Sequence, residues 1–187
     1  MSRRLVILDR DGVINHDSDE FVRTPAEWLP IDGSIEAIAK LSNAGFTVAV
    51  ATNQSGIGRK LLDTPALDAM HEKLRSLVRD AGGDLDRIAY CPHHPDDGCD
   101  CRKPAPGLYK QLSREYAVPL DGVPVIGDSA RDIEAARAID ARPILVLTGN
   151  GEKTAANLQQ RGDQVETFAD LAAAAAALIA ESSKRAS

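Results

Sequence analysis

The sequence predicts an α/β fold in which a parallel sheet lies between two layers of helices. Segments typical of strands and of helices alternate along almost the whole chain, which indicates repeated β–α units. The strand segments are short, uninterrupted apolar runs, as expected for strands that are buried on both faces. No insertion between these segments is long enough to form a large cap domain. The chain has 187 residues, of which 43% are hydrophobic and 27% charged, and this fits one globular domain.

The first half of the chain contains the clearest elements. Residues 4–8 form an apolar run that predicts the first strand, and residues 46–51 form a second run of the same kind. Between them, residues 34–43 have apolar side chains at helical spacing and are followed by Gly45, a residue type that often ends helices. A further helix is predicted over about 64–81, because a capping residue and a proline open it and two glycines follow it.

The second half continues the alternation. It predicts strands at 87–90, 123–126, 143–147 and 164–167, and helices at 106–116, 130–139, 153–161 and 170–181. Residues 91–106 are rich in Cys, Pro, Asp and Gly and are expected to form a loop. We therefore expect a single domain over residues 1–181, with the small polar residues 182–187 as a frayed tail.

The charge balance limits the classes of partner. The chain has 28 Asp and Glu residues against 22 Lys and Arg residues, for a net charge of −6. A non-specific nucleic-acid binder normally has a basic face, so we expect no nucleic-acid partner. The apolar stretch before Asp9 is too short for a signal peptide or a membrane span, so we expect a cytoplasmic protein with no membrane partner.

Polar side chains gather where the predicted strands end. Asp9 and Asp11 follow the first strand, and Thr52 and Asn53 follow the second. Asp128 comes shortly after the strand predicted at 123–126. In open α/β sheets the ligand site lies beyond the carboxyl ends of the strands, so these segments are expected to meet in one crevice.

The sequence Asp9-Arg10-Asp11-Gly12 places two carboxylates close together after a strand. A turn at this point can direct both carboxylates at one centre, where one serves as nucleophile and the other as general acid. Taken alone, the same four residues are equally typical of an ordinary Asp-Gly turn with solvated carboxylates.

Asp128 and Asp132 form a second acidic pair, one helical turn apart. Grouped carboxylates suit Mg²⁺, which prefers oxygen ligands and retains several waters. A helix N-cap with an acidic first turn would account for the same pair without any metal.

Two further segments have the chemistry of a phosphate site. Hydroxyl, amide and backbone N–H groups that can hold phosphate oxygens are concentrated in the run Thr52-Asn53-Gln54-Ser55. Lys103 can neutralise a phosphoryl group, with Arg102 beside it as a planar fork of donors. Seen separately, these segments are also typical of a polar turn and of a solvated basic pair.

The cysteines form one cluster. All three cysteines of the chain, Cys91, Cys99 and Cys101, lie in the predicted loop beside His93 and His94. Three thiolates and one imidazole suit a tetrahedral Zn²⁺ site, and four protein ligands would make that zinc structural. A long loop without its own core would also be stabilised by a metal, although free thiols remain the alternative.

In this order the motifs resemble the haloacid-dehalogenase-like (HAD) phosphatase superfamily. The runs Asp-Arg-Asp-Gly-Val-Ile-Asn, Thr-Asn-Gln-Ser-Gly and Cys-Asp-Cys-Arg-Lys-Pro are similar to those of the heptose-bisphosphate and histidinol-phosphate phosphatases. The resemblance implies a Rossmann-like, HAD-type sheet and favours His93 as the fourth zinc ligand, within a zinc-binding loop at 91–103. One departure is Ser129, where the family often has a lysine.

The resemblance implies hydrolysis of a phosphomonoester through an aspartyl-phosphate. It makes Asp9 the nucleophile and Asp11 the general acid and base. Catalytic Mg²⁺ would be held by Asp9, the Asp11 carbonyl and Asp128, while Thr52 and Lys103 stabilise the charge on the transferring phosphoryl group. Substrate binding is expected from Asp17, Asn53, Gln54, Ser55, Arg59 and Arg102.

The implied substrate is a sugar bisphosphate. We expect removal of the 7-phosphate of D-glycero-D-manno-heptose 1,7-bisphosphate, in the biosynthesis of heptose precursors for the lipopolysaccharide core or a related glycan, by a monomer. Histidinol phosphate or another small phosphomonoester is the alternative substrate. A zinc-stabilised binding module without turnover is the alternative from another class.

Overall fold

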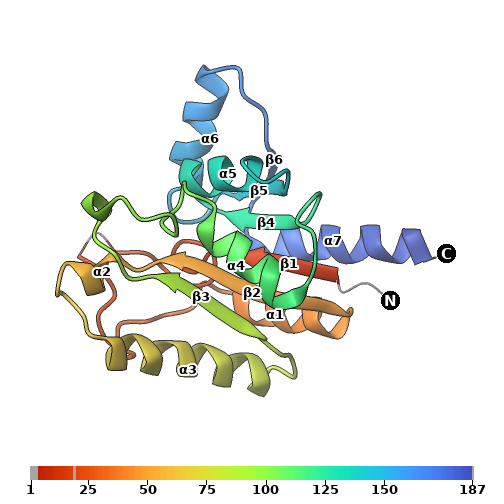
Figure 1. The fold of residues 1–187 in the computed structure, drawn as a ribbon. Coiled ribbons are helices and arrows are strands. Elements are labelled where there is room, and N and C mark those ends of the chain that lie inside the picture. Colours follow the sequence, from red (N-terminus) through yellow and green to blue (C-terminus); the bar gives the residue numbers. More distant parts are fainter. Residues whose placement is uncertain (1–3, 19, 187) are drawn as a thin grey trace.

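The computed structural model describes residues 4–18 and 20–186 (Figure 1). Its strands are β1 (Arg4–Leu8), β2 (Phe46–Asn53), β3 (Arg87–Cys91), β4 (Pro124–Gly127), β5 (Arg142–Val146) and β6 (Glu166–Phe168). Its longer helices are α1 (Ser34–Asn43), α3 (Thr64–Asp80), α4 (Gly107–Tyr116), α5 (Ala130–Arg137), α6 (Gly151–Gln160) and α7 (Leu171–Ala186). The strands form one six-stranded sheet in the order β3-β2-β1-β4-β5-β6, and every pair is parallel. The predicted three-layer α/β fold is confirmed, and no described segment forms a separate cap.

Several boundaries differ from those expected. Strand β2 continues through Asn53, and two short helices, α2 (Ser55–Gly58) and η1 (Pro95–Asp97), are too brief to show a periodic pattern. Helix α7 reaches Ala186, so residues 182–186 continue the helix where the sequence predicted a frayed tail. The hydroxyls of Ser182 and Ser183 each donate to the Ile179 carbonyl oxygen at 3.1 Å, which explains how this polar segment remains compatible with the helix. Ser187 lies outside the described residues.

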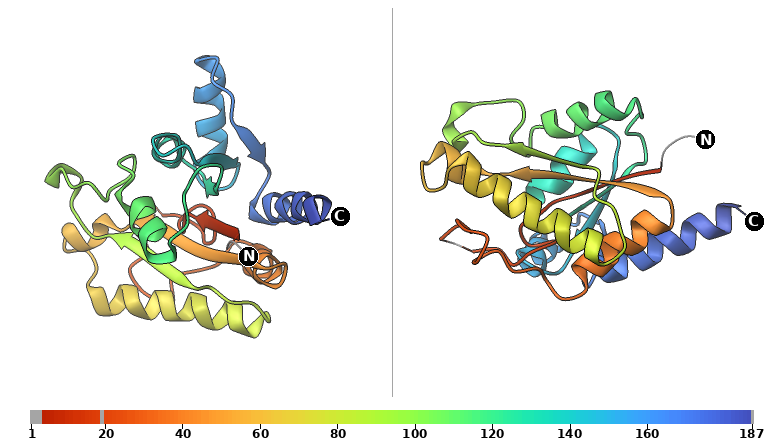
Figure 2. Two further views of the ribbon diagram at one scale, coloured as in Figure 1. Left: turned by 45° about the vertical axis from the view of Figure 1, so that its right-hand side comes forward. Right: turned by 90° about the horizontal axis from the view of Figure 1, so that it is seen from below.

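The sheet separates two apolar layers. Along β1 the side chains alternate, so that Val6 and Leu8 join the core under α1, α3 and α7, while Leu5 and Ile7 join the core under α4 and α5. The right-hand view of Figure 2 shows α1 and α3 together on the near side of the sheet. Because both faces are covered, the uninterrupted apolar strands of the sequence are explained.

The strand order places the crevice of the sheet between β1 and β4. The chain proceeds from β1 to β2 and β3 on one side, then returns to β4 and continues outward to β5 and β6. The loops after β1 and β4 therefore diverge, which is the switch point where open α/β sheets bind ligands. The backbone N–H of Asp9 donates to the Ile126 carbonyl at 2.8 Å, so the ends of the two strands are joined at this point. None of the described helices is both long and apolar enough to cross a bilayer.

Helix α3 contributes to the core beneath the site. Asp63 caps it by accepting from the backbone N–H of Ala66 at 2.9 Å. Its buried apolar residues recur at helical spacing, at Leu67, Met70, Leu74 and Val78.

We predict that Leu74→Ala lowers the free energy of unfolding by about 2–5 kcal/mol, because Leu74 is fully buried and its truncation leaves a cavity. Urea denaturation followed by circular dichroism measures the effect. Asp68→Asn on the exposed side of the same helix is the control and should change stability by less than about 0.5 kcal/mol. Equal stability of both variants would contradict the assignment of Leu74 to the core.

Candidate active site

A cavity of about 290 Å³ opens where β1, β2 and β4 end. All of the residues predicted for catalysis, substrate binding and magnesium line it, namely Asp9, Asp11, Asp17, Thr52, Asn53, Gln54, Ser55, Arg59, Arg102, Lys103 and Asp128. These residues come from segments that are distant in the sequence, and the parallel sheet is what brings them together.

Asp9 lies at the base of the cavity, directly after β1. Its Oδ1 accepts from the backbone N–H of Arg10 at 2.7 Å and lies 2.9 Å from the Nζ of Lys103. Burial raises the pKa of Asp9 to about 8, since the attraction of Lys103 is offset by repulsion from Asp132 and Asp128. The positive charge of Lys103 is therefore too small to stabilise the ionised form of Asp9 against burial and the neighbouring carboxylates.

Asp11 is held by five hydrogen bonds from three neighbouring side chains. The Arg10 guanidinium donates to both of its oxygens, with Nη2 at 2.8 Å from Oδ1 and 3.1 Å from Oδ2. Asn15 donates to Oδ1 at 2.9 Å and Gln54 donates to Oδ2 at 2.8 Å. Burial raises the pKa of Asp11, but the charge of Arg10 and these hydrogen bonds outweigh it and hold the pKa below its usual value.

Asp128 is positioned by Asn150, which sequence analysis missed. The backbone N–H and the Nδ2 of Asn150 both donate to Oδ2 of Asp128, at 2.8 Å and 3.2 Å. Gly12 and Gly149 have positive φ angles, of 80° and 57°, and a Cβ on either would collide with the Asp128 carboxylate. Burial raises the pKa of Asp128 to about 6, although the hydrogen bonds from Asn150 lower it.

Lys103 is a buried cation placed between two carboxylates. Its Nζ lies 2.6 Å from Oδ1 of Asp132 and donates to the carbonyl oxygen of Ala51 at 2.9 Å. Burial lowers the pKa of Lys103, but Asp132 and Asp9 outweigh it and raise the pKa above its usual value. The hydroxyl of Ser129 donates to the other oxygen of Asp132 at 2.6 Å. Ser129, at the position where the family often has a lysine, thus holds Asp132 and also caps α5.

Asn53 and Gln54 line the cavity but are engaged by the protein itself. The Asn53 amide accepts from the backbone N–H of Lys103 at 3.0 Å and donates to its carbonyl at 3.1 Å. The Gln54 amide donates to Asp11 and, at 3.0 Å, to the Thr52 hydroxyl. These contacts hold both side chains in place, and their contact with substrate stays a prediction.

Three arginines line the cavity, Arg59, Arg102 and Arg131, and Arg131 was not among the predicted residues. Arg59 and Arg131 are exposed and so mark its outer part, whereas the side chains of Asp9 and Lys103 are only 13% and 2% exposed. Burial and the nearby charge of Arg131 lower the pKa of Arg102, and its buried Nη1 has no hydrogen-bond partner among the described residues. Such an arrangement is typical of a site for an anion.

The acidic groups at the base of the cavity fit Mg²⁺. Carboxylate oxygens of Asp9, Asp128 and Asp132 lie within 4.8 Å of one another. Both oxygens of Asp132 are engaged by Lys103 and Ser129, so Asp9 and Asp128 are the carboxylates that could hold the ion. An all-oxygen set with uncompensated negative charge is the chemistry that Mg²⁺ prefers.

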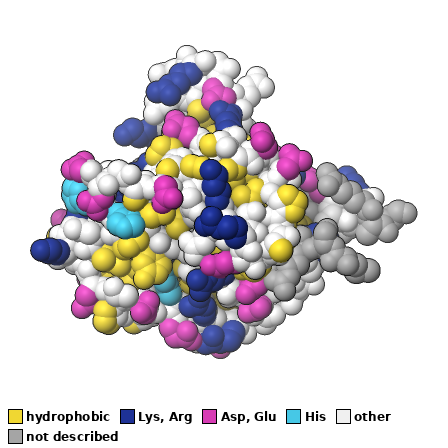
Figure 3. Space-filling view, viewed as in Figure 1, with side chains coloured by type: hydrophobic (Ala, Val, Ile, Leu, Met, Phe, Trp, Pro, Cys, Tyr) yellow, Lys and Arg dark blue, Asp and Glu magenta, His cyan; other side chains and the backbone are white. Residues whose placement is uncertain are grey.

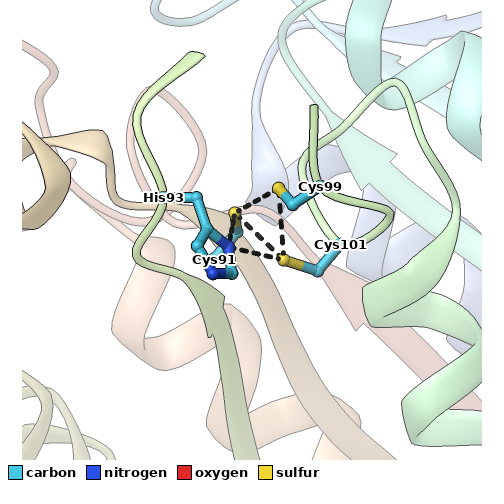
Figure 4. Close-up of side chains that lie close together, drawn as sticks. All are labelled: Cys91, His93, Cys99 and Cys101. Carbon is cyan, nitrogen blue, oxygen red and sulfur yellow. Dashed lines mark hydrogen bonds between the residues drawn. The ribbon is translucent and has the colours of Figure 1, made fainter. Parts of the chain in front are cut away.

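The cysteine loop forms a second, separate cluster (Figure 4). The Nδ1 of His93 lies 3.5 Å from the sulfur of Cys91 and 3.2 Å from that of Cys101, and the three sulfurs lie 3.2–3.6 Å apart. Zinc with sulfur ligands at about 2.3 Å would separate its ligand atoms by roughly 3.5–3.8 Å, so these four residues fit a tetrahedral ion. His94 instead caps η1 by accepting from the backbone N–H of Asp96 at 3.3 Å.

Known proteins resemble this chain over nearly its whole length. A D-glycero-beta-D-manno-heptose-1,7-bisphosphate 7-phosphatase from Pseudomonas aeruginosa is 57% identical over 179 residues, which cover 96% of this chain and 99% of the relative. The chain belongs to this phosphatase family. A HAD-hydrolase-like family model also matches residues 100–174. Because its relatives are named as phosphatases, the protein is a phosphatase.

Solved structures agree with the family assignment. D,D-heptose 1,7-bisphosphate phosphatase from Bordetella bronchiseptica, complexed with magnesium and phosphate, matches with a TM-score of 0.90 and 51% identity over 95% of this chain and 99% of that chain. The corresponding enzyme from Burkholderia thailandensis matches with a TM-score of 0.73 and 39% identity, over the same 95% and 99%.

Some residues of this phosphatase site could not be recognised in the sequence. Asn150 lies in a segment with no distinctive motif, and only the fold brings it to the cavity. Arg131 lies between Asp128 and Asp132, but nothing in that pattern marks the arginine itself as a cavity residue. His71 could have been noticed in the sequence, because it is a polar residue among the apolar positions that form the buried face of α3. It is buried beneath Arg10, with its Nε2 at 3.3 Å from Arg10 Nη1.

We predict that the protein retains more than about half an equivalent of zinc when purified without chelator, and that His93→Ala weakens zinc binding at least about 100-fold. Loss of zinc should lower Tm by about 6–12 °C, the shift for about 3 kcal/mol in a domain of this size. Elemental analysis and thermal denaturation measure both effects. His94→Ala is the matched control, and a zinc content that fell equally in both variants would contradict the assignment of His93.

Proposed function

We propose that the protein removes the 7-phosphate of D-glycero-β-D-manno-heptose 1,7-bisphosphate, in heptose precursor biosynthesis. The supporting observation is that one cavity has two places for an anion: Asp9 with Lys103 at its base, and the arginines at its outer part. A sugar with a phosphate at each end would occupy both. The names of the relatives support the same substrate and the β anomer.

In the first step an oxygen of Asp9 attacks phosphorus in line and forms the aspartyl-phosphate. The bond from phosphorus to the sugar oxygen breaks, and Asp11 gives its proton to that oxygen. In the second step Asp11 takes a proton from water as the water attacks phosphorus. Asp9 is then released together with inorganic phosphate. Lys103 and Thr52 stabilise the charge on the transferring oxygens.

The pKa shifts of the two aspartates run opposite to these roles. The protein groups raise the pKa of Asp9, the nucleophile, and lower that of Asp11, the acid. The dianionic phosphate of the substrate would raise the pKa of Asp11 by repulsion and so favour its protonated form. When bound by Asp9, the Asp11 carbonyl and Asp128, Mg²⁺ supplies positive charge that favours ionised Asp9 and screens it from the phosphate.

The second phosphate is assigned to Arg102 and Arg59. Arg102 follows Cys101 in the zinc-binding loop, so the zinc would hold the guanidinium at the outer part of the cavity. Asp17 and Ser55 also line the cavity and are proposed to contact sugar hydroxyls. Lys60, the basic neighbour of Arg59, does not line the cavity among the described residues.

We predict that Asp9→Asn lowers kcat at least about 10³-fold, because no other group can form the phospho-enzyme. The fold should be retained, since the change removes a buried charge that is repelled by Asp128 and Asp132. Phosphate release and thermal denaturation measure the two effects. Asp17→Asn removes another cavity carboxylate and should reduce kcat less than about tenfold. Wild-type turnover by Asp9→Asn would refute the nucleophile assignment.

We predict that Arg102→Met lowers kcat/KM for the heptose bisphosphate by roughly 10- to 100-fold, because a charged hydrogen bond to the second phosphate is lost. Heptose 7-phosphate and histidinol phosphate lack that phosphate and should be affected less than about threefold. Steady-state kinetics with the three substrates measures this, with Lys60→Met as the control. A preference of the wild type for histidinol phosphate would instead support the alternative substrate.

A further inference from the structure

Two buried polar side chains next to Asp11 have no part in the reaction as described. Arg10 is 1% exposed and His71 is 4% exposed. Burying such groups is unfavourable unless they are hydrogen-bonded, so their contacts must account for them. They come from different parts of the fold: Arg10 follows β1, and His71 lies 61 residues later on α3.

The contacts form a continuous line from α3 to the carboxylate of Asp11. The Nε and Nη2 of Arg10 donate to Oδ1 of Asp11 at 3.0 Å and 2.8 Å, and Nη2 also reaches Oδ2 at 3.1 Å. The remaining nitrogen, Nη1, lies 3.3 Å from Nε2 of His71. A guanidinium has only donors, so Nε2 of His71 must be the acceptor and the imidazole must be neutral.

The surroundings of His71 keep it in this neutral form. Burial, together with the charges of Arg10 and Arg75, lowers the pKa of His71 to about 3. Its ring also packs against Tyr90 of β3, with the ring centroids 5.7 Å apart at an angle of 57°. The imidazole is therefore fixed both by the helix that carries it and by the sheet.

We propose that His71 and Arg10 are positioning residues for Asp11: His71 orients the guanidinium of Arg10, and the guanidinium directs the Asp11 carboxylate toward the leaving oxygen. This inference rests on the proposed function, because it concerns the residue that protonates the leaving group. A single contact with a cation would be enough to neutralise the charge of Asp11, so neutralisation alone does not explain the full set of contacts. The planar fork touches both oxygens, and Asn15 and Gln54 complete a set of donors that permits one orientation.

The leaving group of the substrate separates this role from a merely structural one. A sugar alkoxide needs a proton as it departs, whereas p-nitrophenolate departs near neutral pH without one. The parameter kcat/KM reports the steps through departure of the leaving group and is independent of the later hydrolysis of the phospho-enzyme. A variant in which Asp11 is misdirected should therefore lose kcat/KM for the sugar phosphate and retain it for p-nitrophenyl phosphate.

The experiment compares full-length wild type with His71→Leu, His71→Gln and Arg10→Lys in the presence of Mg²⁺. We expect His71→Leu and Arg10→Lys to lose about 10- to 100-fold in kcat/KM for the heptose bisphosphate and less than about threefold for p-nitrophenyl phosphate. His71→Gln supplies another neutral acceptor and should restore most of the activity. Leu74→Ala, which destabilises the same helix and leaves both His71 and Arg10 in place, should affect the two substrates equally.

An equal loss for both substrates in His71→Leu and Arg10→Lys, or no loss in folded variants, would overturn the inference. If the wild type hydrolyses p-nitrophenyl phosphate but not the heptose bisphosphate, the proposed substrate is wrong, and the comparison proceeds with any alkyl phosphate that the wild type accepts. A wild type that hydrolyses no phosphomonoester refutes the proposed function and the inference with it.

Discussion

The catalytic end of the sheet depends on one buried ion-pair network, in which Lys103 lies between Asp9 and Asp132. The parallel sheet brings several carboxylates to the ends of β1 and β4, where burial makes their mutual repulsion strong. The ammonium group of Lys103 offsets that repulsion, and the Ala51 carbonyl accepts a further hydrogen bond from it. Since Lys103 belongs to a loop rather than to the sheet, the site is stable only if that loop is held in place.

The loop is held from both ends by different kinds of interaction. On one side, Cys101 and its partners form a cluster with the spacing of a tetrahedral zinc site (Figure 4). On the other, the side chain of Asn53 bonds both backbone groups of Lys103. Helix α2 also packs closely against the loop, since a Cβ on Gly58 would collide with the backbone of His94. The cysteine cluster and Lys103 are therefore held by contacts within the same loop.

The distribution of charge explains how an acidic protein can bind an anion. On the face shown in Figure 3, acidic and basic side chains are interspersed, and neither sign forms a large patch. Within the cavity, buried Lys103 lies between Asp9 and Asp132, and Arg59, Arg102 and Arg131 add further positive charge to the lining. A net charge of −6 thus says little about the potential that a ligand meets, because nearby charges dominate in a confined site.

The sequence by itself determined the alternation of strands and helices, the polar ends of the strands, and the residue types that meet in the cavity and in the cysteine cluster. These features are local, because apolar periodicity and motif spacing are properties of neighbouring residues. Tertiary structure decided what those groups contact: it turned Asn53 and Gln54 toward Lys103 and Asp11, brought Asn150 to Asp128, and placed His71 behind Arg10. Such partners lie far apart in the chain, and no local pattern encodes a hydrogen bond that forms only when separate elements pack together.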